Sequence, residues 1–163
     1  VDYLLTRKDL VDPDRIVAAG GSQGGALAVA TAALHPKVAL CLADSPSNAM
    51  LHHSVDPTMY GSFGPTVGQV PDGQTLDDLK QTLSYYDPAN LAVRIKCPTA
   101  IGLTVGDLTV HSMGGLGIYH NLTGLKPGQK WFLPGVNTGF HANSRDGGRK
   151  FRELKDKLVA DGQ

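Results

Sequence analysis

The chain has 163 residues, of which 41% are hydrophobic and 18% charged; this suits one globular domain with a buried core and argues against a disordered chain. Lysine and arginine together number 15, as do aspartate and glutamate, so the basic excess of a nucleic-acid-binding domain is lacking. The longest apolar runs fall far short of the ~20 residues that span a bilayer. We therefore expect neither nucleic acid nor a membrane as a partner.

Short apolar runs alternate with helical patterns along most of the sequence. After a possible helix end at 1–8, apolar runs predict buried strands at 15–20, 38–43, 99–104 and 129–133. Helical patterns are found at 24–34, 75–83, 112–122 and 146–159. The helix at 24–34 is apolar almost all round, which predicts that it is buried. Strands that are joined through helices pair in parallel. The order therefore predicts an α/β fold, with a mostly parallel sheet of about four strands and flanking helices.

The segment 45–96 interrupts this alternation. It is rich in Pro, Gly, Ser and His, and we interpret it as a lid-like insertion over the carboxyl edge of the sheet, within a single domain that spans 1–163. Near its end, Asp87 and Pro88 are typical of a helix N-cap followed by proline at the first helical position.

A G-x-S-x-G motif joins the first predicted strand to the helix that follows. It reads Gly20-Gly21-Ser22-Gln23-Gly24. A serine on so sharp a turn exposes its hydroxyl. We expect that the positions two residues before and two residues after it must be glycine, because there is no room for a side chain. The N–H of Gln23, at the start of the helix, could stabilise an oxyanion. A glycine turn without chemistry is the alternative; a phosphate loop fits less well, since its motifs do not occur.

A nucleophilic serine needs a base, and the base needs an acid that orients it. Among six histidines, His141 is favoured because it follows the last predicted strand in a glycine-rich loop before the closing helix. Two residues are candidates for the acid, Asp107 after the third strand and Asp44 after the second. The glycine before Asp107 favours it, although either aspartate could instead cap its own turn. No metal-binding cysteine or histidine pattern occurs, so neither metal nor cofactor is expected.

Three stretches resemble the acetyl xylan esterase and cephalosporin-C deacetylase family of α/β-hydrolases. They read VDPDRIVAAGGSQGGALAVATAAL, then SYYDPANLAVRIKCPTAIGLTVGD, then the glycine-rich loop that ends in histidine. The resemblance implies that Ser22 is the nucleophile, Asp107 the acid and His141 the base, with Gln23 at the oxyanion. It implies removal of acetyl groups from sugars, often oligosaccharides, without a metal.

Family members are longer, so the resemblance implies a partial α/β-hydrolase fold, the C-terminal catalytic half. The strands and the second oxyanion donor that the family has upstream would precede Val1. The strand at 15–20 would then lie at a sheet edge, which invites pairing with another chain. We expect the chain to be joined to an N-terminal half or to form a homo-oligomer.

Together these features predict a serine esterase that acts on an acetyl ester of a small molecule or an oligosaccharide. Two alternatives stay open. One is a half-hydrolase without activity that serves as a binding or assembly module. The other is a hydrolase with the same three residues that cleaves another ester or a peptide.

Overall fold

The computed structural model describes residues 1–54, 70–136, 141 and 145–160. The helices and strands follow one another in the order α1 (Asp2–Thr6), β1 (Ile16–Gly21), α2 (Gln23–Leu34), β2 (Val38–Asp44), α3 (Leu51–Ser54), α5 (Leu76–Ser84), α6 (Pro88–Leu91), the 3-10 helix η1 (Ala92–Arg94), β3 (Thr99–Val105), α7 (Ser112–Asn121), β4 (Lys130–Val136) and α8 (Arg145–Ala160).

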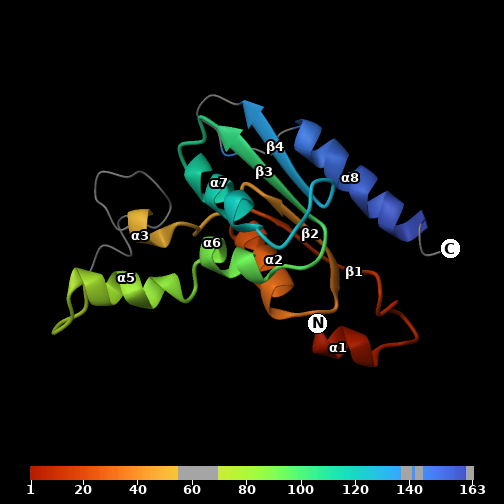
Figure 1. The fold of residues 1–163 in the computed structure, drawn as a ribbon, viewed down its shortest axis with the longest axis horizontal. Coiled ribbons are helices and arrows are strands. Elements are labelled where there is room, and N and C mark those ends of the chain that lie inside the picture. The colour runs from red at the N-terminus through yellow and green to blue at the C-terminus, as the bar shows by residue number, and fades with distance from the viewer. Residues whose placement is uncertain (55–69, 137–140, 142–144, 161–163) are drawn as a thin grey trace.

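The four strands form one sheet in the order β1-β2-β3-β4, and each neighbouring pair is parallel. This confirms the predicted fold class and places β1 at an edge of the described sheet. Parallel strands end at the same side of a sheet (Figure 1). The ends of β1, β2, β3 and β4 therefore bring Ser22, Asp44, Asp107 and His141 to one carboxyl edge.

One face of the sheet is covered by α2, α6, η1 and α7. Val29 of α2, Ile101 of β3, and Ile118 and Leu122 at α7 belong to this core, and all four are fully buried. The apolar pattern of α2 predicted a helix buried all round, and this is wrong for the described structure. The helix packs on the sheet along one side only, so Leu27 on its other side is 61% exposed.

The opposite face is covered by α8. Its amphipathic sequence turns Phe151, Leu154 and Leu158 toward the sheet, where they pack with Leu40 of β2 and Trp131 of β4. In Figure 1, α8 lies across the sheet from α7. Each face of the sheet is thus covered by helices, as expected for strands with long apolar runs.

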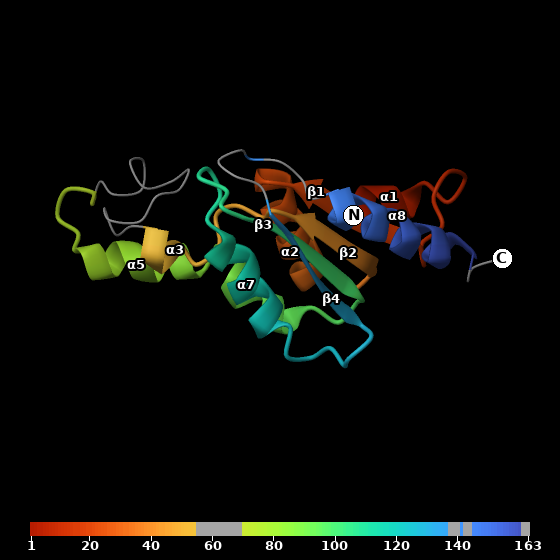
Figure 2. The ribbon, with the colours of Figure 1, turned by 90° about the horizontal axis from the view of Figure 1, so that it is seen from above.

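The helices of the insertion extend beyond the sheet. Figures 1 and 2 show α3 and α5 to one side of the strands, at the end away from α8. Thr75 and Asp78 form a capping box at the start of α5, and Asp87 caps α6 with Pro88 in its first turn, as predicted. The lid-like role of the insertion stays a prediction, and its residues 55–69 lie outside the described part. No helix in the described ranges has the length and hydropathy to cross a membrane.

Candidate active site

Ser22 is the single residue between the end of β1 and the start of α2. Its φ of 55° and ψ of −124° are strained for a residue with a side chain. The main chain around it is held firmly, because the Ser22 N–H donates to the Asp44 carbonyl at 2.9 Å and its own carbonyl accepts the N–H groups of Gly25 and Ser47, each at 3.0 Å. The sharp strand-to-helix turn expected from the motif is present.

The glycines around Ser22 differ in how strictly they are required. A Cβ on Gly20 would lie 2.4 Å from the carbonyl carbon of Gly24, so no side chain fits there. A Cβ on Gly24 meets nothing within 4 Å, so the expected need for a bare position two residues after the serine is wrong. The crowded position is Gly25, whose Cβ would lie 3.0 Å from the Asp44 carbonyl oxygen. The backbone of α2 at residue 24 is what approaches position 20, so glycine is required at position 20 but not at position 24.

Gln23 is the first residue of α2, a helix of 12 residues. The first N–H groups of a helix have no partner within it and point along the axis toward the preceding turn. The Gln23 N–H is therefore one of these free donors at the N-terminal end of α2, next to Ser22. Its role stays a prediction.

Asp107 and His141 are brought together although 34 residues separate them. His141 Nδ1 lies 2.7 Å from Asp107 Oδ2, and the Asp107 carboxylate is shielded from solvent. The other oxygen, Oδ1, accepts the N–H groups of Thr109 at 2.8 Å and Val110 at 2.9 Å. Asp107 therefore caps its own turn and contacts the histidine at the same time, so these two interpretations of its sequence context do not exclude each other.

The same contacts set the charge of Asp107. Burial opposes ionisation, but the hydrogen bonds from His141 and from the Val110 and Thr109 N–H groups outweigh it, and the pKa of Asp107 is lowered below its usual value. A carboxylate that stays ionised can hold an imidazole ring by its Nδ1–H and leave Nε2 free to accept a proton.

Asp44, the other candidate acid, is the last residue of β2 and is buried. Its Oδ1 has no hydrogen-bond partner within the described ranges. Two other histidines have partners of their own. His35 Nε2 at the end of α2 lies 2.9 Å from Asp2 Oδ1, and His111 Nδ1 accepts the Met113 N–H at the start of α7. Of the two candidate acids, it is Asp107 that is hydrogen-bonded to His141.

Sequence reasoning missed the second role of Asp87. Besides capping α6, this carboxylate accepts the N–H of Met50 at 2.9 Å and that of Leu51 at 2.7 Å. It thereby fixes a segment in which Ser45, Asn48 and Met50 all have positive φ. The Asp-Pro pair indicated only the local cap, because nothing in the pattern identifies a partner 36 or 37 residues away.

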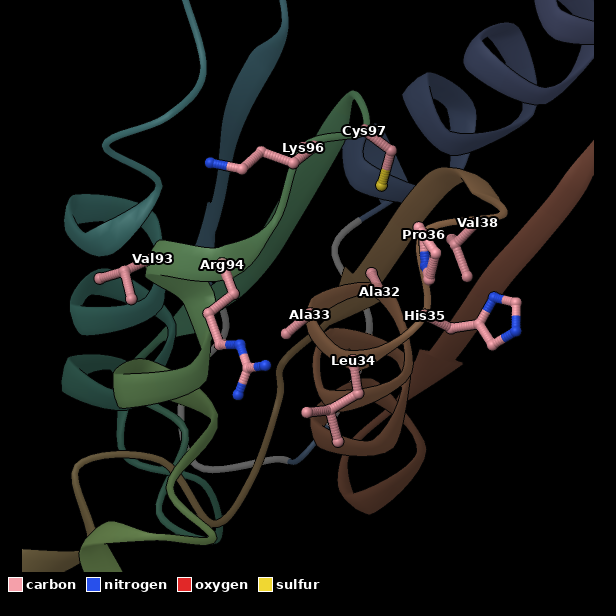
Figure 3. Close-up of a pocket in the computed structure, with 10 residues that line it drawn as sticks. All are labelled: Ala32, Ala33, Leu34, His35, Pro36, Val38, Val93, Arg94, Lys96 and Cys97. Atoms are coloured by element: carbon pink, nitrogen blue, oxygen red, sulfur yellow. The ribbon is translucent and has the colours of Figure 1, made fainter.

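A cavity of about 530 Å³ lies at the opposite end of the sheet, between the end of α2, the start of β2 and the segment before β3. Figure 3 shows Arg94 reaching toward Leu34 there, whereas Lys96 points away from the cavity. In the described part of the chain no three His, Cys, Asp or Glu side chains are grouped as metal ligands. Cys41 and Cys97 are both buried and free.

Comparison with known proteins places the chain in a family. The sequence profile of the acetyl xylan esterase family (AXE1) matches residues 4–129. The chain belongs to this family. Acetyl esterase Axe7A from Xylanibacter ruminicola is 36% identical over 106 residues, which cover 62% of this chain and 22% of that esterase.

Solved structures agree on the fold. Acetyl xylan esterase from Paenibacillus sp. R4 superposes with a TM-score of 0.74 at 27% identity, over 96% of this chain and 49% of that protein. Acylaminoacyl peptidase from Pyrococcus horikoshii has a TM-score of 0.67 at 16% identity, over 97% of this chain and 26% of that protein. The fold is that of the α/β-hydrolases, and the chain spans about half the length of the solved esterases.

Proposed function

We propose that the chain carries the catalytic residues of a serine esterase that removes acetyl groups from carbohydrate esters. The observation that carries this proposal is the Asp107–His141 contact of 2.7 Å at the sheet edge where Ser22 stands on its strained turn. Membership of an esterase family supports the reaction class. The acetyl group and the carbohydrate are proposed by likeness to relatives described as acetyl esterases and acetyl xylan esterases.

In the proposed reaction, His141 Nε2 takes the proton of Ser22 as Oγ attacks the acetyl carbonyl carbon. The Asp107 carboxylate accepts a hydrogen bond from the Nδ1–H of His141 and stabilises the imidazolium that results. The Gln23 N–H donates to the tetrahedral oxyanion; one such donor is typically worth about 3 kcal/mol of the activation barrier.

The intermediate then collapses. The C–O bond to the sugar breaks, the imidazolium of His141 gives its proton to the departing alcohol, and acetyl-Ser22 remains. Water, deprotonated by the neutral imidazole, attacks this ester. The acetyl–Oγ bond breaks, Ser22 regains its proton from His141, and acetic acid leaves and ionises to acetate in water.

We further propose that β1 pairs along its outer edge, either with an N-terminal segment of a longer chain or with a second copy. Exposed rows of N–H and C=O groups at a sheet edge are ready to accept another strand. Sedimentation equilibrium of the chain tests this proposal. A stable monomer across the micromolar range would contradict it for the isolated chain.

The esterase proposal is tested by Ser22→Ala. Turnover of p-nitrophenyl acetate and labelling by a fluorophosphonate should both be lost, by about 10⁶-fold where the serine acts with its histidine. Ser84→Ala, at a half-buried serine on α5 outside the proposed catalytic residues, is the matched control and should leave both unchanged. Equal labelling of wild type and Ser22→Ala would refute the nucleophile. A folded wild-type chain that is never labelled would favour the binding-module alternative.

A further inference from the structure

Asp87 takes no part in the proposed reaction, although it is one of the most deeply buried polar residues of the described structure, at 1% exposed. Its carboxylate caps α6 through the N–H of Ala89 at 2.9 Å. It also accepts the N–H of Met50 at 2.9 Å and that of Leu51 at 2.7 Å, which are 37 and 36 residues away. A helix cap needs only the first of these bonds, so the other two call for a reason outside α6.

Residues 44–51, which we call the connecting segment, join Asp87 to the turn that carries Ser22. The segment starts at the end of β2, where the carbonyl of Asp44 accepts the Ser22 N–H at 2.9 Å. Three residues later the N–H of Ser47 donates to the Ser22 carbonyl at 3.0 Å. The far end of the segment is bonded to Asp87 at residues 50 and 51. Only residues 48 and 49 separate the contact with the turn from the contact with the carboxylate.

The backbone of the connecting segment is strained. Ser45, Asn48 and Met50 have φ values of 41°, 59° and 55°, in the left-handed region that residues with a side chain rarely adopt. Such conformations persist only where the surrounding structure holds them. At the far end of the segment the Asp87 carboxylate does this, because it binds the N–H of Met50 itself and that of the next residue.

The connecting segment is also packed tightly between α2 and α7. A Cβ on Gly25 of α2 would lie 3.1 Å from the Pro46 Cα, and a Cβ on Gly114 of α7 would lie 3.2 Å from the Ala49 Cβ. Both helices therefore have a glycine where the segment passes. Because a close-packed interior transmits a displacement rather than absorbing it, a shift at the far end of the segment reaches its contact with Ser22.

We propose that Asp87 is a positioning residue for Ser22, which acts through the connecting segment to hold the backbone of the nucleophile's turn. With the carboxylate in place, the Asp44 carbonyl and the Ser47 N–H keep their bonds to the two sides of Ser22, and its strained conformation is retained. The consequence for the reaction rate rests on the proposed esterase function. The effect on the hydrogen bond between Ser47 and Ser22 does not.

Amide hydrogen exchange, measured by NMR on the 163-residue chain, tests the connection without any substrate. Asp87→Asn keeps the size of the side chain but replaces one acceptor oxygen by an NH₂ group. Val38→Ala is the matched control, since it removes buried volume at the amino end of β2, away from the connecting segment.

The two variants are compared at the urea concentrations at which the N–H of the fully buried Ile101 exchanges equally fast in both. The Ser47 N–H should then exchange at least about tenfold faster in Asp87→Asn than in Val38→Ala, because its segment opens locally. Equal exchange of the Ser47 N–H in the two variants would overturn the proposal.

The rate at which a fluorophosphonate labels Ser22 gives a second readout. Misplacing a reacting group by about 1 Å costs about 100-fold in rate. Labelling of Asp87→Asn should therefore be about 10–100-fold slower than labelling of Val38→Ala. Equal labelling rates would show that Asp87 contributes to stability alone.

A second pair of variants keeps the proposal open to refutation if Asp87→Asn does not fold. Gly114→Ala crowds Ala49 of the connecting segment and leaves the Asp87 carboxylate in place. Gly115→Ala, its control, crowds Leu103 of β3 to a similar degree, with a Cβ at 3.3 Å from the Leu103 Cβ. Labelling should slow in Gly114→Ala only, and the same rate in both variants would count against the connection.

The outcomes separate this inference from the esterase proposal. A wild-type chain that is never labelled, but in which Asp87→Asn accelerates exchange of the Ser47 N–H, would refute the esterase function and support the role of Asp87 in holding the turn. A labelled chain in which neither the exchange nor the labelling rate responds to Asp87→Asn would do the reverse.

Discussion

The buried carboxylate of Asp87 holds two distant parts of the chain together, and its removal should be costly. Its Oδ1 accepts the N–H groups of Met50 and Ala89, both at 2.9 Å, and its Oδ2 accepts the N–H of Leu51 at 2.7 Å. The residue is 1% exposed, so water cannot easily replace these bonds. Substitution therefore leaves backbone donors buried without a partner.

The cost can be graded by the side chain that is introduced. Asparagine keeps an oxygen that can accept two of the three N–H groups but turns an NH₂ toward the third, so we expect a loss of about 1–3 kcal/mol in the free energy of unfolding. Alanine abandons all three donors and leaves a small void, so about 3–5 kcal/mol is expected.

Urea unfolding followed by circular dichroism measures both losses. Asp77→Asn, at an exposed position in the first turn of α5, is the control and should change stability by no more than about 0.5 kcal/mol. Equal losses for Asp87→Asn and Asp87→Ala, or losses no greater than the control's, would show that these hydrogen bonds do not hold the segment.

Two predictions concern the site itself. Gly20→Ala should destabilise the fold by at least about 2 kcal/mol, because its Cβ would lie 2.4 Å from the Gly24 backbone. Gly24→Ala should be neutral or stabilising by up to about 1 kcal/mol. Thermal unfolding measures both, and equal changes in the unfolding temperature would contradict the one-sided contact. The lowered pKa of Asp107 means that it contributes stability above its unfolded value of about 3.9 and that this contribution is lost as pH falls through its folded pKa. Asp107→Asn should therefore lose less stability than wild type on acidification below pH 5, and parallel curves would contradict this.

Local patterns predicted the elements well because each carries its own signal. The apolar runs predicted all four strands to within a few residues, and the Asp87-Pro88 pair predicted the start of α6. The burial of α2 was predicted too broadly, because the number of faces that a neighbour covers is a property of the whole fold. Leu27, exposed on its outer side, shows this.

The sequence predicted which residues lie at the carboxyl edge of the sheet, because their position along a strand decides this. It predicted less well which side chains contact each other there. Parallel pairing alone brings the ends of the strands to one edge, so Asp107 and His141 could be expected near each other. Their 2.7 Å contact, and the choice of Asp107 over Asp44 as the hydrogen-bonded acid, depend on the loops. The one-sided contact of Gly20 with Gly24 likewise depends on the angle at which α2 leaves the strand, which no spacing rule supplies.

The two oxygens of Asp107 accept hydrogen bonds from different parts of the chain, and this has a consequence for the order in which the site is assembled. Oδ1 accepts the N–H groups of Thr109 and Val110, two and three residues further along the chain. Oδ2 contacts His141, 34 positions later. During synthesis on the ribosome the turn can thus close around its own carboxylate before the histidine codon has been translated. The last segment of the chain then meets an acceptor that is already aimed, and placing the imidazole costs less entropy than if both partners had to be ordered at once.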